Sequence, residues 1–334
     1  MIVKREGTGW SRKTFLISLT AAVFGALYLA NDTFIMHRVI VYRDSFTAVS
    51  VYLVFGAWVG LICMLIYNSL FGKWIDNDYP GFNFGTRKMQ TFALISGAIA
   101  AGSTAFCLMG NQSLDPSLVT ALSNLSIIYL VGYDSLRRNI SFKNIVVPMS
   151  LVVLGSALAS ITKISGGFEI TLAGILILLI GRCGTDAVEK IVRQQGVWKS
   201  DAITFNFWRF LWLAVFGTIF SLLVAFARGS INELLTLFLQ IWKSALPWIL
   251  LTMFFVFFFS TLLQKAMKTG AISKVTMVVN FQIALGIPLT LLLNQIAPGV
   301  FGNISQETAV WVVRSVGALM IVFGIYYLRN KKSS

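Results

Sequence analysis

Charged side chains stand inside stretches of this sequence that are otherwise apolar. Arg182, Asp186, Glu189 and Arg193 are spaced by four, three and four residues, which places all of them on one face of an α-helix. Removing a charge from water is costly, so such residues usually pair or perform a function. We expect Arg182 and Asp186 to pair along the helix and to contact a charged substrate. The alternative is a neutral pair that only lowers the cost of burial.

Two further cations, Arg209 and Lys274, lie in apolar stretches. Lys274 follows the expected start of a helix, where unpaired backbone N–H groups and the positive end of the helix dipole also favour an anion. With Arg182, these cations would form a basic vestibule suited to a carboxylate, a phosphate or a diphosphate. Alternatively, Lys274 extends its side chain to the nearby water.

A set of polar residues recurs along the chain at a shift of 156 residues. Thr120 and Asn124 correspond to Thr276 and Asn280, and Ser117 corresponds to Ser273. Within each set the Ser, Thr and Asn residues are spaced i, i+3 and i+7, which puts them on one helical face. We predict that the two polar stripes line a substrate pathway. The alternative is that they join neighbouring helices by hydrogen bonds.

Polar candidates for the outer part of this pathway are Tyr28, Asn31, Asp32 and Tyr52. Asp32 lies near the end of its apolar stretch, where it is either solvated or buried, and a buried Asp32 could couple transport to protons. The chain has a single His, His37, and three Cys residues in apolar runs. A His-based metal site or a catalytic triad is therefore not expected, and we predict no cofactor.

The elements that carry these residues are apolar spans. Hydrophobic residues make up 57% of the 334 and charged residues only 12%, whereas soluble domains carry about a quarter charged residues. These values exclude a cytosolic enzyme, a nucleic-acid-binding protein and a disordered chain. A span of about 20 residues crosses a hydrocarbon core of about 30 Å as a helix. We predict ten such spans, at residues 15–36, 47–70, 89–110, 116–135, 143–162, 170–190, 203–227, 245–264, 271–293 and 307–328.

The connecting segments determine the expected topology. With the N-terminus in the cytoplasm, 18 of the 27 Lys and Arg residues fall in cytoplasmic segments, 5 in outer segments and 4 inside spans. This bias follows the positive-inside rule, so the net charge of +14 does not indicate a nucleic-acid partner. The first span is too long for a signal-peptide core. We expect an integral protein of a prokaryotic plasma (inner) membrane, with both termini cytoplasmic. Residues 231–239 form either a short interfacial helix or an ordinary loop.

The ten spans divide into two halves of five, residues 1–162 and 163–334. Because five is odd, the second half enters the membrane upside down relative to the first, and inverted repeats are a recurrent transporter architecture. We therefore predict an all-α integral membrane protein with ten transmembrane helices as two inverted five-helix repeats. Small residues in the fifth and tenth spans, Gly155, Ala159, Gly317 and Gly324, allow close packing or a homodimer through these two spans.

Three segments resemble a known family: AVFGALYLANDTFIM (22–36), GNQSLDPSLVTALSNLSIIYLVGYDSLRRNISF (110–142) and MKTGAISKVTMVVNFQIALGIPLTLLL (267–293). With the layout of the whole chain, they are similar to the drug/metabolite transporter superfamily, in particular its EamA-like members. More distantly, Gly270, Ala271 and Lys274 resemble the GALNK motif of nucleotide-sugar transporters. The resemblance implies ten-helix carriers with cytoplasmic termini. It also implies a cavity lined by spans one to four and six to nine, with peripheral fifth and tenth spans that often form dimers.

These features predict a secondary active transporter that moves a small metabolite, preferably anionic or zwitterionic, by alternating access. Its partners would be the small-molecule substrate and the bilayer. One alternative is an exporter of hydrophobic or cationic compounds, which the many aromatic residues would suit. A membrane-embedded lipid-modifying enzyme is a weaker alternative, because only Asp76 and Asp78 resemble a cluster of acids near an interface. We do not expect an enzyme.

Overall fold

The computed structural model describes residues 11–113, 125–137, 142–159, 161, 183–296 and 307–330. Among the predicted site residues, Thr120, Asn124 and Arg182 lie outside these ranges. All regular elements within them are helices. Their bounds are α1 (Arg12–Phe34), the π-helix η1 (Ile35–Val39), α2 (Ser45–Ile75), α3 (Arg87–Ser113), α5 (Ser126–Leu136), α6 (Phe142–Ala159), α8 (Thr185–Val197), α9 (Ala202–Ala227), α10 (Ile231–Thr269), α11 (Ile272–Val279), α12 (Phe281–Ile296) and α13 (Thr308–Asn330).

Within the described residues, seven helical segments are long and apolar enough to cross a membrane. The predicted spans 89–110, 116–135 and 170–190 lie partly outside the residues whose side chains are described, so the prediction of ten spans stays a prediction. The seven segments are residues 12–32, 46–75, 142–159, 202–227, 231–269, 272–289 and 308–328.

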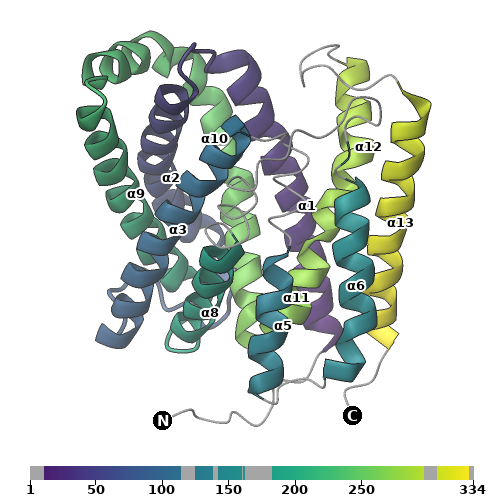
Figure 1. Ribbon diagram of the computed structural model, residues 1–334. Coiled ribbons are helices and arrows are strands. Elements are labelled where there is room, and N and C mark those ends of the chain that lie inside the picture. The colour runs from purple at the N-terminus through teal and green to yellow at the C-terminus, as the bar shows by residue number, and fades with distance from the viewer. Residues whose placement is uncertain are drawn as a thin grey trace.

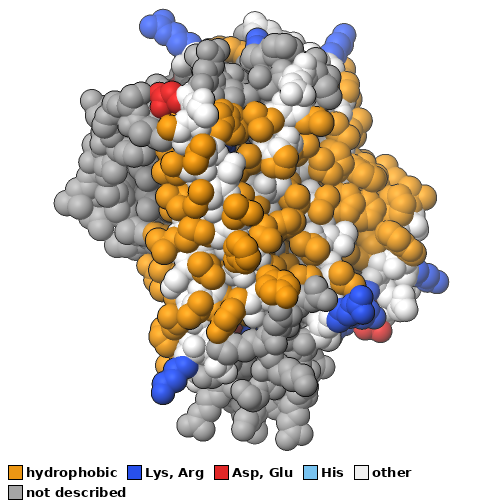
Figure 2. Space-filling view, turned by 90° about the vertical axis from the view of Figure 1, so that its right-hand side faces the viewer, with side chains coloured by type: hydrophobic (Ala, Val, Ile, Leu, Met, Phe, Trp, Pro, Cys, Tyr) orange, Lys and Arg blue, Asp and Glu red, His pale blue; other side chains and the backbone are white. Residues whose placement is uncertain are grey.

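The surface of the molecule is apolar across its middle. Figure 2 shows a broad band of hydrophobic side chains, with Lys and Arg side chains towards its upper and lower ends. Within the described part, Leu223, Phe226 and Phe323 are 63%, 75% and 62% exposed. Exposing many large apolar side chains to water is unfavourable, whereas exposing them to lipid is not. With the seven apolar helices, this surface shows that the chain is an all-α membrane protein.

Helices α1 and α10 pack side by side in the middle of the molecule (Figure 1). Helix α10 also packs on α2, and α1 packs on α11 and α12. On one side of this pair, α3 packs on both α8 and α9, and α2 packs on α9. On the other side, α6 packs on α13. The long helices run between the upper and lower ends of the molecule in Figure 1. Polar residues along them therefore lie at different distances from these ends.

Helices α2 and α9 begin in the same way. Asp44 accepts hydrogen bonds from the backbone N–H and hydroxyl of Thr47, at 3.0 and 2.6 Å. Asp201 accepts one from the backbone N–H of Thr204 at 2.7 Å. Each aspartate thereby satisfies a donor that the first helical turn leaves unpaired. Burial acts to raise the pKa of Asp44, but hydrogen bonds from Thr47 and Arg228 outweigh it and lower that pKa.

Helix α10 is one continuous element of 39 residues. Of the two alternatives for residues 231–239, the helix is correct, but this helix is not separate from the span predicted at 245–264. Pro247 lies within it without ending it. The buried residues Ile241, Ala245 and Ile249 follow one another at four-residue intervals across the proline. Their packing on one face compensates for the backbone hydrogen bond that proline removes.

The span predicted at 271–293 is divided in two. Helix α11 ends at Val279 and α12 begins at Phe281. The backbone N–H of Asn280 donates to the carbonyl of Thr276, whereas that of Ile283 donates to the carbonyl of Asn280, each at 3.0 Å. The hydrogen-bond step therefore shortens from four residues to three at the junction, which tightens the helix there.

The small residues of α6 and α13 face each other within the chain. A Cβ atom on Gly155 would lie 2.6 Å from the carbonyl oxygen of Gly317, and one on Gly317 would lie 2.4 Å from the backbone nitrogen of Ala159. Only glycine allows the two backbones to approach this closely. The small faces predicted for close packing thus meet inside one molecule, so a homodimer through these helices would have to use their other faces.

Candidate functional site

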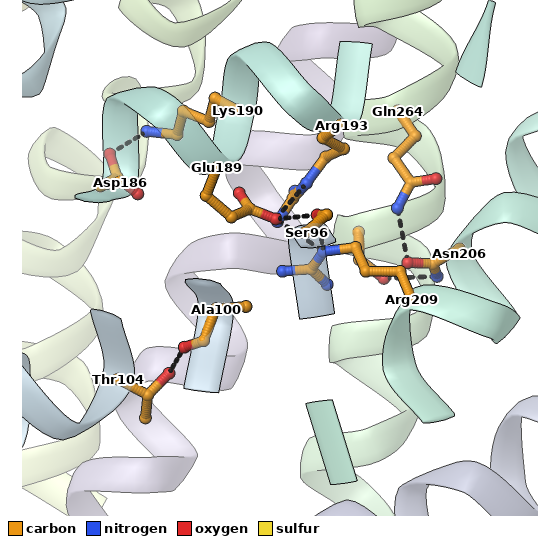
Figure 3. A network of polar contacts seen from close by, with 11 residues as sticks. Ser96, Ala100, Thr104, Asp186, Glu189, Lys190, Arg193, Asn206, Arg209 and Gln264 are labelled. Carbon is orange, nitrogen blue, oxygen red and sulfur yellow. Dashed lines mark hydrogen bonds and ion pairs between the residues drawn. The ribbon is translucent and has the colours of Figure 1, made fainter. Parts of the chain in front are cut away.

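Glu189 is the centre of a buried cluster of charges (Figure 3). One of its carboxylate oxygens accepts hydrogen bonds from Nε and Nη2 of Arg193 at 3.0 and 2.8 Å, and from Nε of Arg209 at 2.7 Å. The hydroxyl of Ser96 also donates to it, at 2.7 Å. All four side chains are buried. Hydrogen bonds between ionised partners are about twice as strong as neutral ones, so this cluster firmly joins α8, α9 and α3.

The local sequence explains how these groups meet. Glu189 and Arg193 are four residues apart on α8, which brings both to one side of the helix. Gly97 follows Ser96 on α3, and a Cβ atom there would lie 2.7 Å from the carbonyl oxygen of Arg209. The glycine therefore lets α3 approach α9 closely enough for Ser96 to reach both Glu189 and Arg209.

The positive charges of the cluster outnumber its negative charges by one. Asp186 pairs with Lys190 at 2.7 Å, one turn from the two arginines that share Glu189. These five groups hold three positive and two negative charges. Arg209 donates through its Nε to Ser96 and Glu189, and its two terminal nitrogens donate no hydrogen bond within the described part of the chain. The forked end of Arg209 is suited to a carboxylate or a phosphate.

A second polar network begins one turn before Arg209 on α9. The Asn206 side-chain amide donates to the hydroxyls of Ser260 and Thr261 at 2.8 and 3.2 Å. Its oxygen accepts from Nε2 of Gln264 at 2.6 Å, as Figure 3 shows. The oxygen of Gln264 is buried and has no hydrogen-bond partner among the described residues. A second set of polar groups therefore lies next to the Glu189 cluster and joins α9 to α10.

Asp32 lies in a second, different cluster between α1, α2 and α10. It accepts hydrogen bonds from the hydroxyls of Tyr52 and Thr252, the latter at 3.2 Å. The amide of Asn31 donates to the hydroxyl of Thr252 at 2.7 Å and to the carbonyl of Trp248 at 2.9 Å. The predicted outer pathway residues Asn31, Asp32 and Tyr52 are thus brought together. Tyr28, one turn earlier, packs its ring against Phe259, with ring centres 5.1 Å apart.

The two clusters occupy equivalent places in the two halves of the sequence. Moving along the chain by 157 residues takes Asp32 to Glu189 and Tyr52 to Arg209. The same shift takes the helix cap Asp44 to the cap Asp201. In each cluster the carboxylate precedes its main donor by 20 residues.

The third member of each cluster comes from the opposite half. Ser96, in the first half, binds Glu189 in the second, and Thr252, in the second half, binds Asp32 in the first. Thr252 lies 156 residues after Ser96. Each cluster therefore consists of a carboxylate and its donor from one half, and a hydroxyl from the other half that ties the two together. We call these the Asp32 latch and the Glu189 latch.

Lys274 lies beside an acidic residue that the sequence analysis did not single out. Asp134 of α5 is fully buried and accepts hydrogen bonds from the backbone N–H and hydroxyl of Ser273, at 2.8 and 2.6 Å. Its charge also attracts Lys274. The anion at the N-terminus of α11 is therefore a carboxylate of the chain itself, and its negative charge lies close enough to act on Lys274.

The junction of α11 and α12 holds polar atoms without partners. Oγ1 of Thr276 and Nδ2 of Asn280 are buried, and neither has a hydrogen-bond partner within the described ranges. The same holds for Oε1 of Gln282, which faces the bare backbone of Gly25 on α1. Each unsatisfied group costs about 1–3 kcal/mol. Three such groups therefore lie at one helix break, among the residues that the structure describes.

Comparisons with known proteins bear on the fold alone. No family model matches the chain, and no curated protein matches it. Several solved structures have a similar fold. One of them, titled only as the crystal structure of a protein, superposes with a TM-score of 0.58 over 95% of this chain and 96% of the other, at 13% sequence identity. The arrangement of helices therefore recurs over nearly the full length of another protein.

Proposed function

We propose that this chain is a secondary active transporter that works by alternating access, and that it belongs to the EamA-like part of the drug/metabolite transporter superfamily. The observation that carries the proposal is the pair of latches, which sit at equivalent positions in the two halves and each join one half to the other. Under this proposal, residues 1–162 and 163–334 are inverted five-helix repeats, and an axis in the membrane plane places the latches on opposite sides.

The helix contacts support this division. If the halves are equivalent, α1 corresponds to α8, α2 to α9 and α3 to α10. The contact of α1 with α10 then corresponds to that of α8 with α3, and both occur. The contact of α2 with α10 likewise corresponds to that of α9 with α3, and both occur. The beginning of α1 and the end of α13 lie at the same end of the molecule in Figure 1. This agrees with an even number of crossings and with both termini in the cytoplasm.

In this mechanism the latches act as gates. Breaking the bond from Thr252 to Asp32 separates α10 from α1 and α2 on one side. Breaking the bonds of Ser96 separates α3 from α8 and α9 on the other. Because the halves have the same architecture, each can adopt the arrangement of the other, and the substrate site between them is exposed to one side at a time.

The substrate that we propose is a small organic anion carrying a carboxylate or phosphate group. The excess positive charge of the Glu189 latch favours such a group, and so do the terminal nitrogens of Arg209, which bind no described residue. Nδ2 of Asn280 and the hydroxyl of Thr276, which have no partner among the described residues, would bind its uncharged polar parts. Lys274 is a weaker candidate than Arg209, because Asp134 already balances it.

A two-step experiment tests the proposal. Purified protein is first screened by thermal shift against metabolites that carry carboxylates or phosphates, because a ligand at 100 times its Kd stabilises the folded state by about 2.7 kcal/mol. Each stabilising compound is then assayed for counterflow in proteoliposomes. We expect saturable counterflow of at least one of them. Stabilising anions that show no counterflow in either direction would contradict a transport function.

A matched pair of variants tests the anion site. Arg209→Lys keeps the charge but loses the planar fork, and we expect it to raise KM for counterflow about tenfold, since about 1.4 kcal/mol of binding is lost. Arg228→Lys changes the same residue type in an exposed pair with Asp44 and should leave KM unchanged. Equal effects of the two substitutions would remove Arg209 from the binding site.

A further inference from the structure

The two latches differ in charge although their positions correspond. Glu189 accepts hydrogen bonds from two arginines. Asp32 accepts only from the hydroxyls of Tyr52 and Thr252, and within the described part of the chain it forms no ion pair. The place that Arg209 takes in one latch is taken by the phenol of Tyr52 in the other.

The groups that face Asp32 are neutral on every described element packed against it. Helix α1 contributes Tyr28 and the amide of Asn31, and α2 contributes Tyr52. Helix α10 contributes the hydroxyl of Thr252 and a backbone carbonyl that Asn31 binds. Phenols are neutral near pH 7, so none of these groups supplies a positive charge to balance an ionised Asp32.

The charged residues nearest along these elements lie outside the latch. Asp44, at the start of α2, pairs with Arg228 at 3.1 Å. The remaining residues are Arg38, Arg43 and Lys243, which are exposed, and His37, whose side chain is not among those described.

A carboxylate in this setting gains a proton more easily than one beside arginines. Removing an unpaired charge from water disfavours the ionised form, whereas two adjacent arginines favour it. The hydroxyls of Tyr52 and Thr252 can donate to an ionised Asp32 or accept from a protonated one. The Asp32 latch can therefore satisfy its hydrogen bonds in both states. Neutralising Glu189 would instead leave two buried cations without an anion.

We propose that Asp32 is a reversible proton-binding site, at which the transporter takes up and releases the proton that drives its cycle. The role in a cycle rests on the proposed function, but binding of the proton does not. Asp32 holds the proton while its hydrogen bond with Thr252 is intact and exchanges it with water when Thr252 moves away. Glu189, at the equivalent position, stays ionised throughout and acts only as a gate.

Carbodiimide labelling tests this site without any transport measurement. Dicyclohexylcarbodiimide is apolar and reacts with protonated carboxyl groups. The unmodified protein in lipid nanodiscs would be labelled at intervals from about pH 5 to about pH 8, where folded proteins are generally most stable. Mass spectrometry of the peptides then gives the labelled fraction at Asp32 and Glu189 in the same molecules.

We expect Asp32 to be labelled at the acidic end of the series, with a labelling rate that falls about tenfold per pH unit above the midpoint. Glu189 should stay unlabelled throughout. No labelling of Asp32 at any pH, labelling that does not depend on pH, or equal labelling of Glu189 would overturn the proposal. If labelling succeeds and no solute is transported, the proton site stands and the transport function fails.

Infrared difference spectroscopy gives a readout that does not depend on access of a reagent. The acid-minus-alkaline spectrum should contain the C=O band of a protonated carboxyl group, which is lost as the pH is raised. Asp32→Asn should remove this band, and Asp44→Asn should leave it. A band that persists in Asp32→Asn would assign the titration to another group and refute the proposal.

Discussion

Glu189 is the single anion that two buried arginines share. Glu189→Gln leaves both cations uncompensated, and we expect it to lower the free energy of unfolding by about 3–5 kcal/mol. Asp32→Asn is the matched variant, because its donors are neutral and an amide oxygen still accepts from them. It should cost only about 1 kcal/mol. Chemical denaturation in detergent measures both, and similar losses would show that the two carboxylates do not differ in their charged surroundings.

Thr276 has a buried hydroxyl without a partner in the described ranges. Thr276→Val removes an unsatisfied group that costs about 1–3 kcal/mol, so the melting temperature should stay the same or rise. If the hydroxyl contacts substrate, counterflow of the anion found by thermal shift should fall at the same time. Thr20→Val is the control, since the hydroxyl of Thr20 is bound to the carbonyl of Leu16 on an exposed surface. A destabilised Thr276→Val with unchanged counterflow would mean a purely structural residue.

The sequence indicated some of these residues and missed others for a physical reason. Arg209, Thr276 and Asn280 stand out because polar groups in apolar spans are costly, and all three lie buried. Ser96 and Thr252 do not stand out, because hydroxyl residues are common in apolar helices and their partners come from distant helices. Extending the shift that relates Asp44 to Asp201 would have linked Asp32 with Glu189.

At the scale of elements, α6 and α13 pack with their backbones in close approach. Gly317→Val places a branched side chain against the backbone of Ala159, so we expect a loss of about 1–3 kcal/mol or more in the free energy of unfolding. Gly102→Ala is the control, because no described atom lies within 4 Å of a Cβ there. It should gain about 0.5–1 kcal/mol from helix propensity. Thermal melts of both variants decide whether this packing holds the two helices together.

The positions of most described helices follow from apolar length, but that of α8, which continues past the predicted span 170–190 to Val197, does not. The predicted spans 47–70 and 203–227 lie within α2 and α9, which extend from Ser45 to Ile75 and from Ala202 to Ala227. The continuity of α10 through Pro247 and the break at Asn280 depend on tertiary packing. A proline normally ends a helix and an asparagine need not, so local propensity alone favours the opposite outcome.

At the scale of the whole molecule, the latches should bias the chain in opposite directions. Thr252→Ala and Ser96→Ala each remove a hydrogen bond to a carboxyl group, worth about 0.5–1.5 kcal/mol for a protonated Asp32 and about 1.5–3 kcal/mol for an ionised Glu189. Such changes alter the ratio of two states from about twofold to more than tenfold. Spin-label distances across α1 and α10 should lengthen in Thr252→Ala, and those across α3 and α8 in Ser96→Ala. Lengthening at the same side in both variants would argue against alternation.

The length of α10 has a consequence for the lipid around the protein. With 39 residues, the helix is about 58 Å long, nearly twice the hydrocarbon thickness of about 30 Å. It must lean steeply or protrude, and hydrophobic mismatch of this kind costs a fraction of a kcal/mol per ångström. The protein should therefore melt at a higher temperature in long-chain phosphatidylcholine than in short-chain vesicles.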